Sequence, residues 1–179
     1  LLDSDRRTCD LMSPKLETES TSFYTFPEEA KAVRAAFLAF FSAPGLGAVS
    51  GIIETPHRTD VFRGLIESTD YYTVLTAHGV FMVISFTIFF LVGLFTWALV
   101  RSLDRPLVNI RITWTWYGLM VTGITMTGVS ILAGFTDAVE MSADVLFTFY
   151  APLQAHPLFY TGLAVFIVGT WLAGADWFR

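Results

Sequence analysis

Charged residues are scarce in this chain. They make up 15% of its 179 residues, whereas soluble domains carry about 25%. The net charge of −5 leaves no basic stripe that could neutralise phosphates, which argues against nucleic-acid binding. The single cysteine, Cys9, excludes an internal disulfide framework and cannot form a thiolate metal site alone.

Motifs of the common soluble enzymes are also missing. The sequence has no phosphate-binding loop, no catalytic-serine arrangement and no paired-histidine metal motif. Residues 1–22 are polar and of mixed charge, without the apolar core of a signal peptide, and we predict a polar N-terminal tail over residues 1–25. Because the chain starts at Leu1 rather than Met and stops at Arg179 without a closing segment, we expect a fragment of a longer protein.

Apolar residues, by contrast, are abundant. They make up 54% of the chain and aromatic residues 16%, more than a soluble protein of this length can bury. We therefore predict an all-α integral membrane protein in contact with lipid. A helix needs about 20 apolar residues to cross a bilayer. Four stretches meet this requirement, at residues 35–53, 73–100, 112–136 and 157–175.

The acidic residues and prolines refine this prediction. Pro27, followed by Glu28 and Glu29, is typical of a helix start. Pro44-Gly45 predicts an interruption or kink in the first span. No Asp or Glu falls inside any of the four ranges, so we expect no carboxylate proton relay in this part of the chain.

Loop charges predict an orientation. The loop between the second and third spans is rich in arginine, and the loop between the third and fourth holds only acidic charges. By the positive-inside rule the arginine loop is cytoplasmic, which also places both ends of the chain in the cytoplasm. Aromatic residues near the span ends are interpreted as interfacial anchors; they are Tyr71, Tyr72, Trp114, Trp116, Trp171 and Trp177.

Small residues in the third span predict close helix packing. They recur four residues apart, as in Gly118/Thr122 and Gly123/Thr127. Such a pattern lets neighbouring helices approach closely in a membrane.

Three histidines are candidates for chemistry. His57 lies in a predicted polar loop and His156 at the entrance to the fourth span, where solvation and an interfacial position explain them. His78 lies inside the second span, where an ionisable residue is a functional-site hypothesis by default. Its neighbours Ala77 and Gly79 would let a flat ligand approach the helix, and histidine is a standard axial haem ligand. A helix–helix hydrogen bond is the alternative. The residues alone leave both open.

Two segments carry a family resemblance. Residues 71–80, Tyr-Tyr-Thr-Val-Leu-Thr-Ala-His-Gly-Val, resemble the start of the second helix in subunit I of haem-copper oxidases. Residues 146–162, with the pattern T-F-Y-x-P-L-x-x-H-x-x-F-Y-x-G, resemble the turn before the fourth helix in the B-type branch, the ba-type cytochrome c oxidases. The resemblance covers residues 26–179.

The resemblance implies that residues 26–179 form the first four helices of a subunit with twelve or more. His78 would be one axial ligand of a low-spin haem b, and the residues that bind the high-spin haem and copper would lie in the missing part. The intact subunit would reduce oxygen to water in aerobic respiration and translocate protons across a prokaryotic plasma membrane. The fragment alone would be inactive.

The implied partners are the rest of subunit I, oxidase subunit II, the bilayer, and a small electron donor such as cytochrome c or a blue copper protein. A nitric oxide reductase-like subunit is one alternative, because that relative has a similar histidine on its second helix. A membrane adaptor or transporter subunit of four helices, with a structural histidine and no cofactor, is the other.

Overall fold

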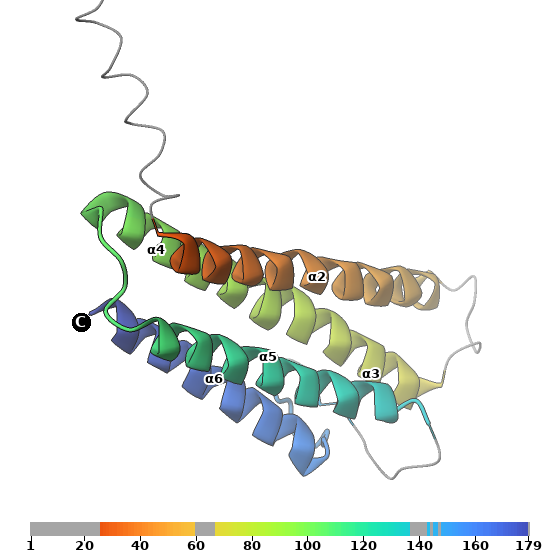
Figure 1. Ribbon diagram of the computed structural model, residues 1–179. Helices are drawn as coiled ribbons and strands as arrows, with labels where there is room; N and C mark the ends of the chain where they lie inside the picture. Colours follow the sequence, from red (N-terminus) through yellow and green to blue (C-terminus); the bar gives the residue numbers. More distant parts are fainter. Residues whose placement is uncertain (1–25, 60–66, 137–142, 144, 147, 179) are drawn as a thin grey trace, which may run out of the picture.

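The structure is a computed structural model that describes residues 26–59, 67–136, 143, 145–146 and 148–178 (Figure 1). The predicted N-terminal tail and Cys9 lie outside the described residues. Helices are the regular secondary structure of the described part, which otherwise holds turns, loops and an isolated β-bridge between Ala143 and Ala155. The all-α prediction is therefore confirmed for this part of the chain.

Four helical rods are long and apolar enough to cross a membrane. The second rod consists of two α-helices joined by a π-helical segment, η2. The elements are α2 (Pro27–Arg58), α3 (Ser68–Gly79), η2 (Val80–Ser85), α4 (Phe86–Leu103), α5 (Ile110–Ala133) and α6 (Pro157–Trp177). All four predicted spans lie largely within these rods, with boundaries that differ by a few residues at most ends.

Helix α2 differs most from its prediction of residues 35–53. It begins at Pro27, with Glu28 and Glu29 in its first turn as expected, and continues through Pro44 to Arg58. The expected interruption at Pro44 is therefore wrong. Membrane helices tolerate proline because only one backbone bond is lost and local adjustments satisfy the freed carbonyl. His57, predicted in a loop, lies in the last turn of this helix.

Acidic residues do occur inside the membrane-length helices, contrary to the prediction. Glu54 lies in α2 and Asp176 in α6, and both residues are buried. The sequence analysis missed them because the predicted apolar spans, residues 35–53 and 157–175, end one residue before Glu54 and Asp176. A carboxylate at a helix end can turn toward a neighbouring helix, which a hydropathy window does not detect.

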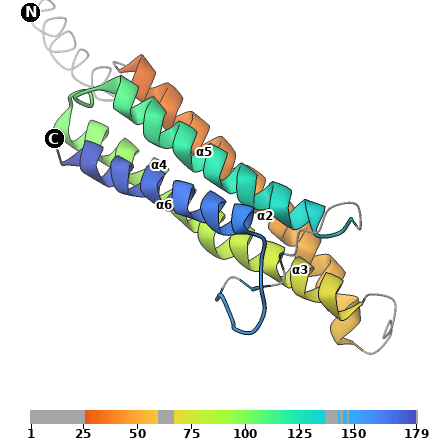
Figure 2. The same ribbon diagram turned by 90° about the horizontal axis from the view of Figure 1, so that it is seen from below.

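The rods form two pairs, α2 with the α3–η2–α4 rod and α5 with α6 (Figures 1 and 2). The α4–α5 loop and the end of α6 lie at one end of the bundle, and the end of α2 and the start of α3 lie at the other. The buried stripe of α2 repeats every seven residues, the spacing of a left-handed helix pair. Its fully buried members include Glu29, Ala36, Ala43 and Ser50.

Glycine brings α5 and α6 into backbone contact. A Cβ atom at Gly162 would lie 2.7 Å from both the carbonyl oxygen of Gly123 and the amide nitrogen of Thr127. A Cβ at Gly169 would lie 2.9 Å from the carbonyl oxygen of Trp116. The predicted packing role of Gly123 and Thr127 is confirmed. Gly118, however, faces open space.

This contact predicts the effect of adding one methyl group to α6. Gly162→Ala should lower the free energy of unfolding in mixed micelles by about 1–3 kcal/mol, because backbone atoms of α5 cannot move aside as a flexible side chain could. Gly174→Ala is the matched control, since its Cβ meets nothing within 4 Å. This control should be neutral or slightly stabilising through helix propensity. Equal effects of the two substitutions would contradict the packing role.

Candidate functional site

His78 lies in the last turn of α3, just before η2. It is nine residues beyond Thr69, where the apolar rod starts, which places it about 13 Å along the helix axis. π-Helical turns inside α-helices are often found at functional sites. The imidazole is half-buried, so part of it is accessible from outside the described chain.

A backbone carbonyl of the neighbouring helix holds the imidazole. The Nδ1 atom of His78 lies 2.8 Å from the carbonyl oxygen of Gly47 in α2. A carbonyl oxygen can only accept, so Nδ1 carries the proton in this bond. In the neutral imidazole the lone pair is then on Nε2, the nitrogen that remains free to bind a metal.

Two glycines of α2 make room for this arrangement. A Cβ atom at Gly51 would lie 3.1 Å from Cε1 and 3.2 Å from Nδ1 of His78. A Cβ atom at Gly47 would collide with the side chain of Met82, one turn further along the rod. Both positions therefore bring the α2 backbone close to the histidine face of the second rod.

The small neighbours of His78 serve packing. Ala77 belongs to a core cluster with Ile131 and Phe159, and Gly79 is buried as well. Ala77 thus packs toward α5 and α6, whereas His78 contacts α2. These two residues therefore do not provide the access for a flat ligand that was expected from them.

The α5–α6 connection docks onto the same turn of α3. The amide of Leu146 donates to the Thr76 hydroxyl over 2.9 Å, and this hydroxyl donates to the carbonyl of Tyr72. Leu146 and Phe149 have left-handed backbones, with φ of 63° and 55°. Non-glycine residues hold this conformation only where surrounding contacts support it. The connection therefore fixes the turn that precedes His78.

The other histidine candidate with a described side chain is a helix cap. His156 precedes Pro157, and its Nδ1 accepts a hydrogen bond from the amide of Leu158 over 3.1 Å. Within the described ranges, no group of three or more His, Cys, Asp or Glu side chains could hold a metal ion.

A second buried polar cluster, missed from the sequence, ties α5 to α6. Asp176 is 2% exposed. Its Oδ2 accepts hydrogen bonds from the Thr113 hydroxyl over 2.8 Å and from the Trp116 indole over 3.2 Å. Trp116 is 1% exposed, so its predicted role as an interfacial anchor is wrong. Trp171, at 73% exposure, keeps that interpretation.

These features describe a helical membrane protein in which the half-buried imidazole of His78 bonds to a neighbouring helix. The family described as "Cytochrome C and Quinol oxidase polypeptide I" matches residues 31–179. The chain belongs to this family, that of haem-copper oxidase subunit I, and is an integral membrane protein.

A sequence relative and a solved structure are consistent with this family assignment. "Cytochrome c oxidase subunit 1" of Thermus thermophilus is 35% identical over 104 residues, 58% of this chain and 17% of the relative. The cryo-EM structure of a heme-copper terminal oxidase dimer superposes with a TM-score of 0.68 at 26% identity, covering 84% of this chain and 26% of that one. The chain therefore spans less than a third of either protein.

The Asp176 cluster predicts a stability effect. Asp176→Ala would leave the Thr113 hydroxyl and the Trp116 indole buried without their acceptor. An unsatisfied buried donor costs about 1–3 kcal/mol, so we expect a loss of at least this size in the free energy of unfolding in mixed micelles. Asp176→Asn keeps an acceptor oxygen and should lose less. If the two variants were equally stable, the hydrogen bonds would not be what stabilises this contact.

Proposed function

We propose that this chain is the N-terminal part of subunit I of a B-type haem-copper terminal oxidase, and that residues 26–179 are the first four helices of its bundle. In this proposal His78 is one axial ligand of a low-spin haem b. The B-type assignment rests on the pattern in residues 146–162. The haem assignment rests on the bond between His78 and Gly47.

This bond supports the haem assignment for two reasons. It fixes the ring orientation and the tautomer, so the Nε2 lone pair is available without rearrangement. It also makes Nε2 a stronger electron-pair donor to a metal, because a hydrogen bond from Nδ1–H to a carbonyl raises the basicity of the imidazole.

When bound, a haem supplies one-electron redox chemistry, with a potential set by its axial ligands and its burial. The contribution of this chain is positional. Gly47 holds the ring, Gly51 leaves space beside it, and the docked Leu146 fixes the preceding turn. The apolar rods limit the access of water to the site.

The rest of the proposal concerns the intact protein. The second axial ligand, the high-spin haem and copper would be held by parts of the subunit outside this chain. Electrons from a small donor protein would pass through the low-spin haem, oxygen would be reduced to water, and protons would be translocated. The rest of subunit I and subunit II would cover the exposed helix faces. The α4–α5 loop, with Arg105 in it and Arg101 and Arg111 in the adjoining helix ends, would face the cytoplasm, with both ends of the chain on that side.

The haem assignment predicts the spectrum of membranes that express the intact gene. His78→Gly should remove the reduced low-spin b-type bands, because one axial ligand is lost, and added imidazole should restore part of them. His156→Ala is the matched control, since that side chain caps a helix. Immunoblots report whether each variant accumulates. Low-spin bands that survive His78→Gly in a protein present at normal level would refute the assignment.

The same assignment makes a prediction for the purified 179-residue chain. It should retain little or no haem, because only one of two axial ligands is present. Pyridine haemochrome analysis measures the haem content per chain. Stoichiometric low-spin haem with two histidine ligands in this preparation would contradict the proposed division of the site.

A further inference from the structure

The helix turn that carries His78 ends at a change of helical register. Helix α3 ends at Gly79, and η2 continues the rod with π-helical turns. The Val80 amide, where the register changes, donates to the carbonyls of both Thr76 and Ala77. A π-helical turn closes over one more residue than an α-helical turn, so the side-chain directions of α3 are out of step with those of α4. The packing of α4 therefore does not by itself set the direction of the His78 side chain.

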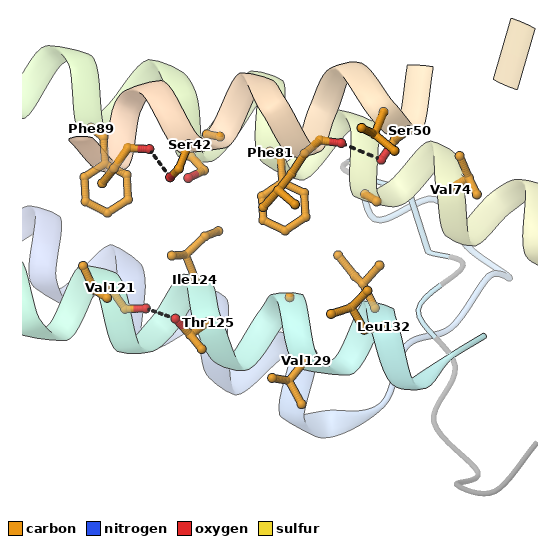
Figure 3. Close-up of a pocket in the computed structure, with 18 of the residues that line it drawn as sticks. Ser42, Ser50, Val74, Phe81, Phe89, Val121, Ile124, Thr125, Val129 and Leu132 are labelled. Carbon is orange, nitrogen blue, oxygen red and sulfur yellow. Dashed lines mark hydrogen bonds between the residues drawn. The ribbon is translucent and has the colours of Figure 1, made fainter. Parts of the chain in front are cut away.

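Helix α5 gives this part of the second rod only partial support. An apolar cavity of about 700 Å³ lies between α2, the second rod and α5. Val74 of α3 and Phe81 of η2 line it from the rod, and Val129 and Leu132 line it from α5 (Figure 3). Within the described chain, Val74 is therefore not packed directly against α5, and the position of α3 depends on contacts that it makes elsewhere.

The α5–α6 connection supplies such a contact through Thr76. The Thr76 side chain is 0% exposed, and its hydroxyl accepts a hydrogen bond from the Leu146 amide over 2.9 Å while it donates to a carbonyl of its own helix. Val145 of the same connection is buried in one apolar cluster with Ala77 and Val80. The connection is thus held by residues on both sides of the histidine in the chain.

Thr76 and His78 point in nearly opposite directions from α3. They are two residues apart, which corresponds to about 200° around an α-helix. The bond from Leu146 therefore holds α3 on the side away from α2, whereas the Nδ1 atom of His78 meets the Gly47 carbonyl of α2 over 2.8 Å. A shift of α3 by about 0.4 Å away from α2 would stretch this contact to the upper limit of an ordinary hydrogen bond.

We propose that Thr76 is a positioning residue for His78. Its hydroxyl holds α3 between the α5–α6 connection and α2, and so keeps the imidazole within reach of the Gly47 carbonyl. This inference rests on the proposed role of His78 as a haem ligand. A weaker bond from Nδ1–H makes Nε2 less basic, and a less basic ligand stabilises ferric iron less. Loss of the Thr76 acceptor should therefore raise the midpoint potential of the low-spin haem.

Redox titration of the low-spin haem, in membranes that express the intact gene, tests this proposal. Thr76→Val keeps a similar shape but removes the acceptor, so the midpoint potential should rise above the wild-type value. Thr76→Ser keeps the hydroxyl and should retain the wild-type potential. Thr73→Val is the matched control. Thr73 is 1% exposed in the same helix, but its hydroxyl donates to the Thr69 carbonyl within α3, so this substitution should leave the potential unchanged.

Hydrogen exchange of the purified assembled protein gives a second readout, which needs no haem signal. The Leu146 amide should exchange several-fold faster in Thr76→Val than in the wild type or in Thr73→Val, because it has lost its acceptor. If immunoblots show that Thr76→Val does not accumulate, Thr76→Cys replaces it in both measurements, because a thiol has a similar volume but is only a weak acceptor.

Any of three results would overturn the proposal: an unchanged midpoint potential in Thr76→Val, an equal shift in Thr73→Val or Thr76→Ser, or unchanged exchange of the Leu146 amide. Failure of the haem assignment is recognised separately, because the low-spin bands would then survive His78→Gly. Bands that depend on His78 but keep their potential in Thr76→Val would reject only the positioning role.

Discussion

The interior of a bilayer offers no water to backbone N–H and C=O groups, and this constraint determines most of what the chain can do. Each spanning segment has to satisfy its own backbone, which requires helices. The hydroxyl side chains follow the same rule: Ser50, Thr73, Thr125 and Thr170 each bond to a carbonyl one turn back in their own helix. Few polar groups therefore remain for hydrogen bonds between helices, and each such bond helps to fix how two helices are placed.

Several polar contacts cross between helices in the described chain, and two of them involve the buried carboxylate of α6 and the candidate histidine. The Asp176 carboxylate joins α6 to α5 through Thr113 and Trp116, and the Gly47 carbonyl joins α2 to His78. Both depend on close approach of the helices. Gly162 and Gly169 allow it in the α5–α6 pair, and glycines of α2 allow it beside His78. Helices α2 and α5 are joined by the hydrogen bond from the Tyr117 hydroxyl to the Ala35 carbonyl, and an apolar cavity lies between these helices and the second rod.

The sequence predicted the fold class and all four spans because lipid imposes a simple rule of length and polarity. It was wrong about Pro44, because a proline costs a membrane helix one bond rather than its continuity. It was also wrong about Trp116, since an aromatic residue near a span end can face lipid headgroups or a neighbouring helix. The position of such a residue along the chain does not tell whether its side chain faces the headgroups or the neighbouring helix.

His78 shows where prediction from the sequence ends. An ionisable residue in an apolar run, together with the family resemblance, was enough to select it, and its role as a haem ligand stays a prediction. The sequence by itself determined that the chain is helical and membrane-embedded, because these properties depend on composition and local spacing. Only the tertiary structure decided that Gly47 holds Nδ1, that Asp176 is buried between helices, and that a cavity lies between α2, the second rod and α5. Each of these depends on how two helix surfaces meet, which residues far apart in the chain determine together.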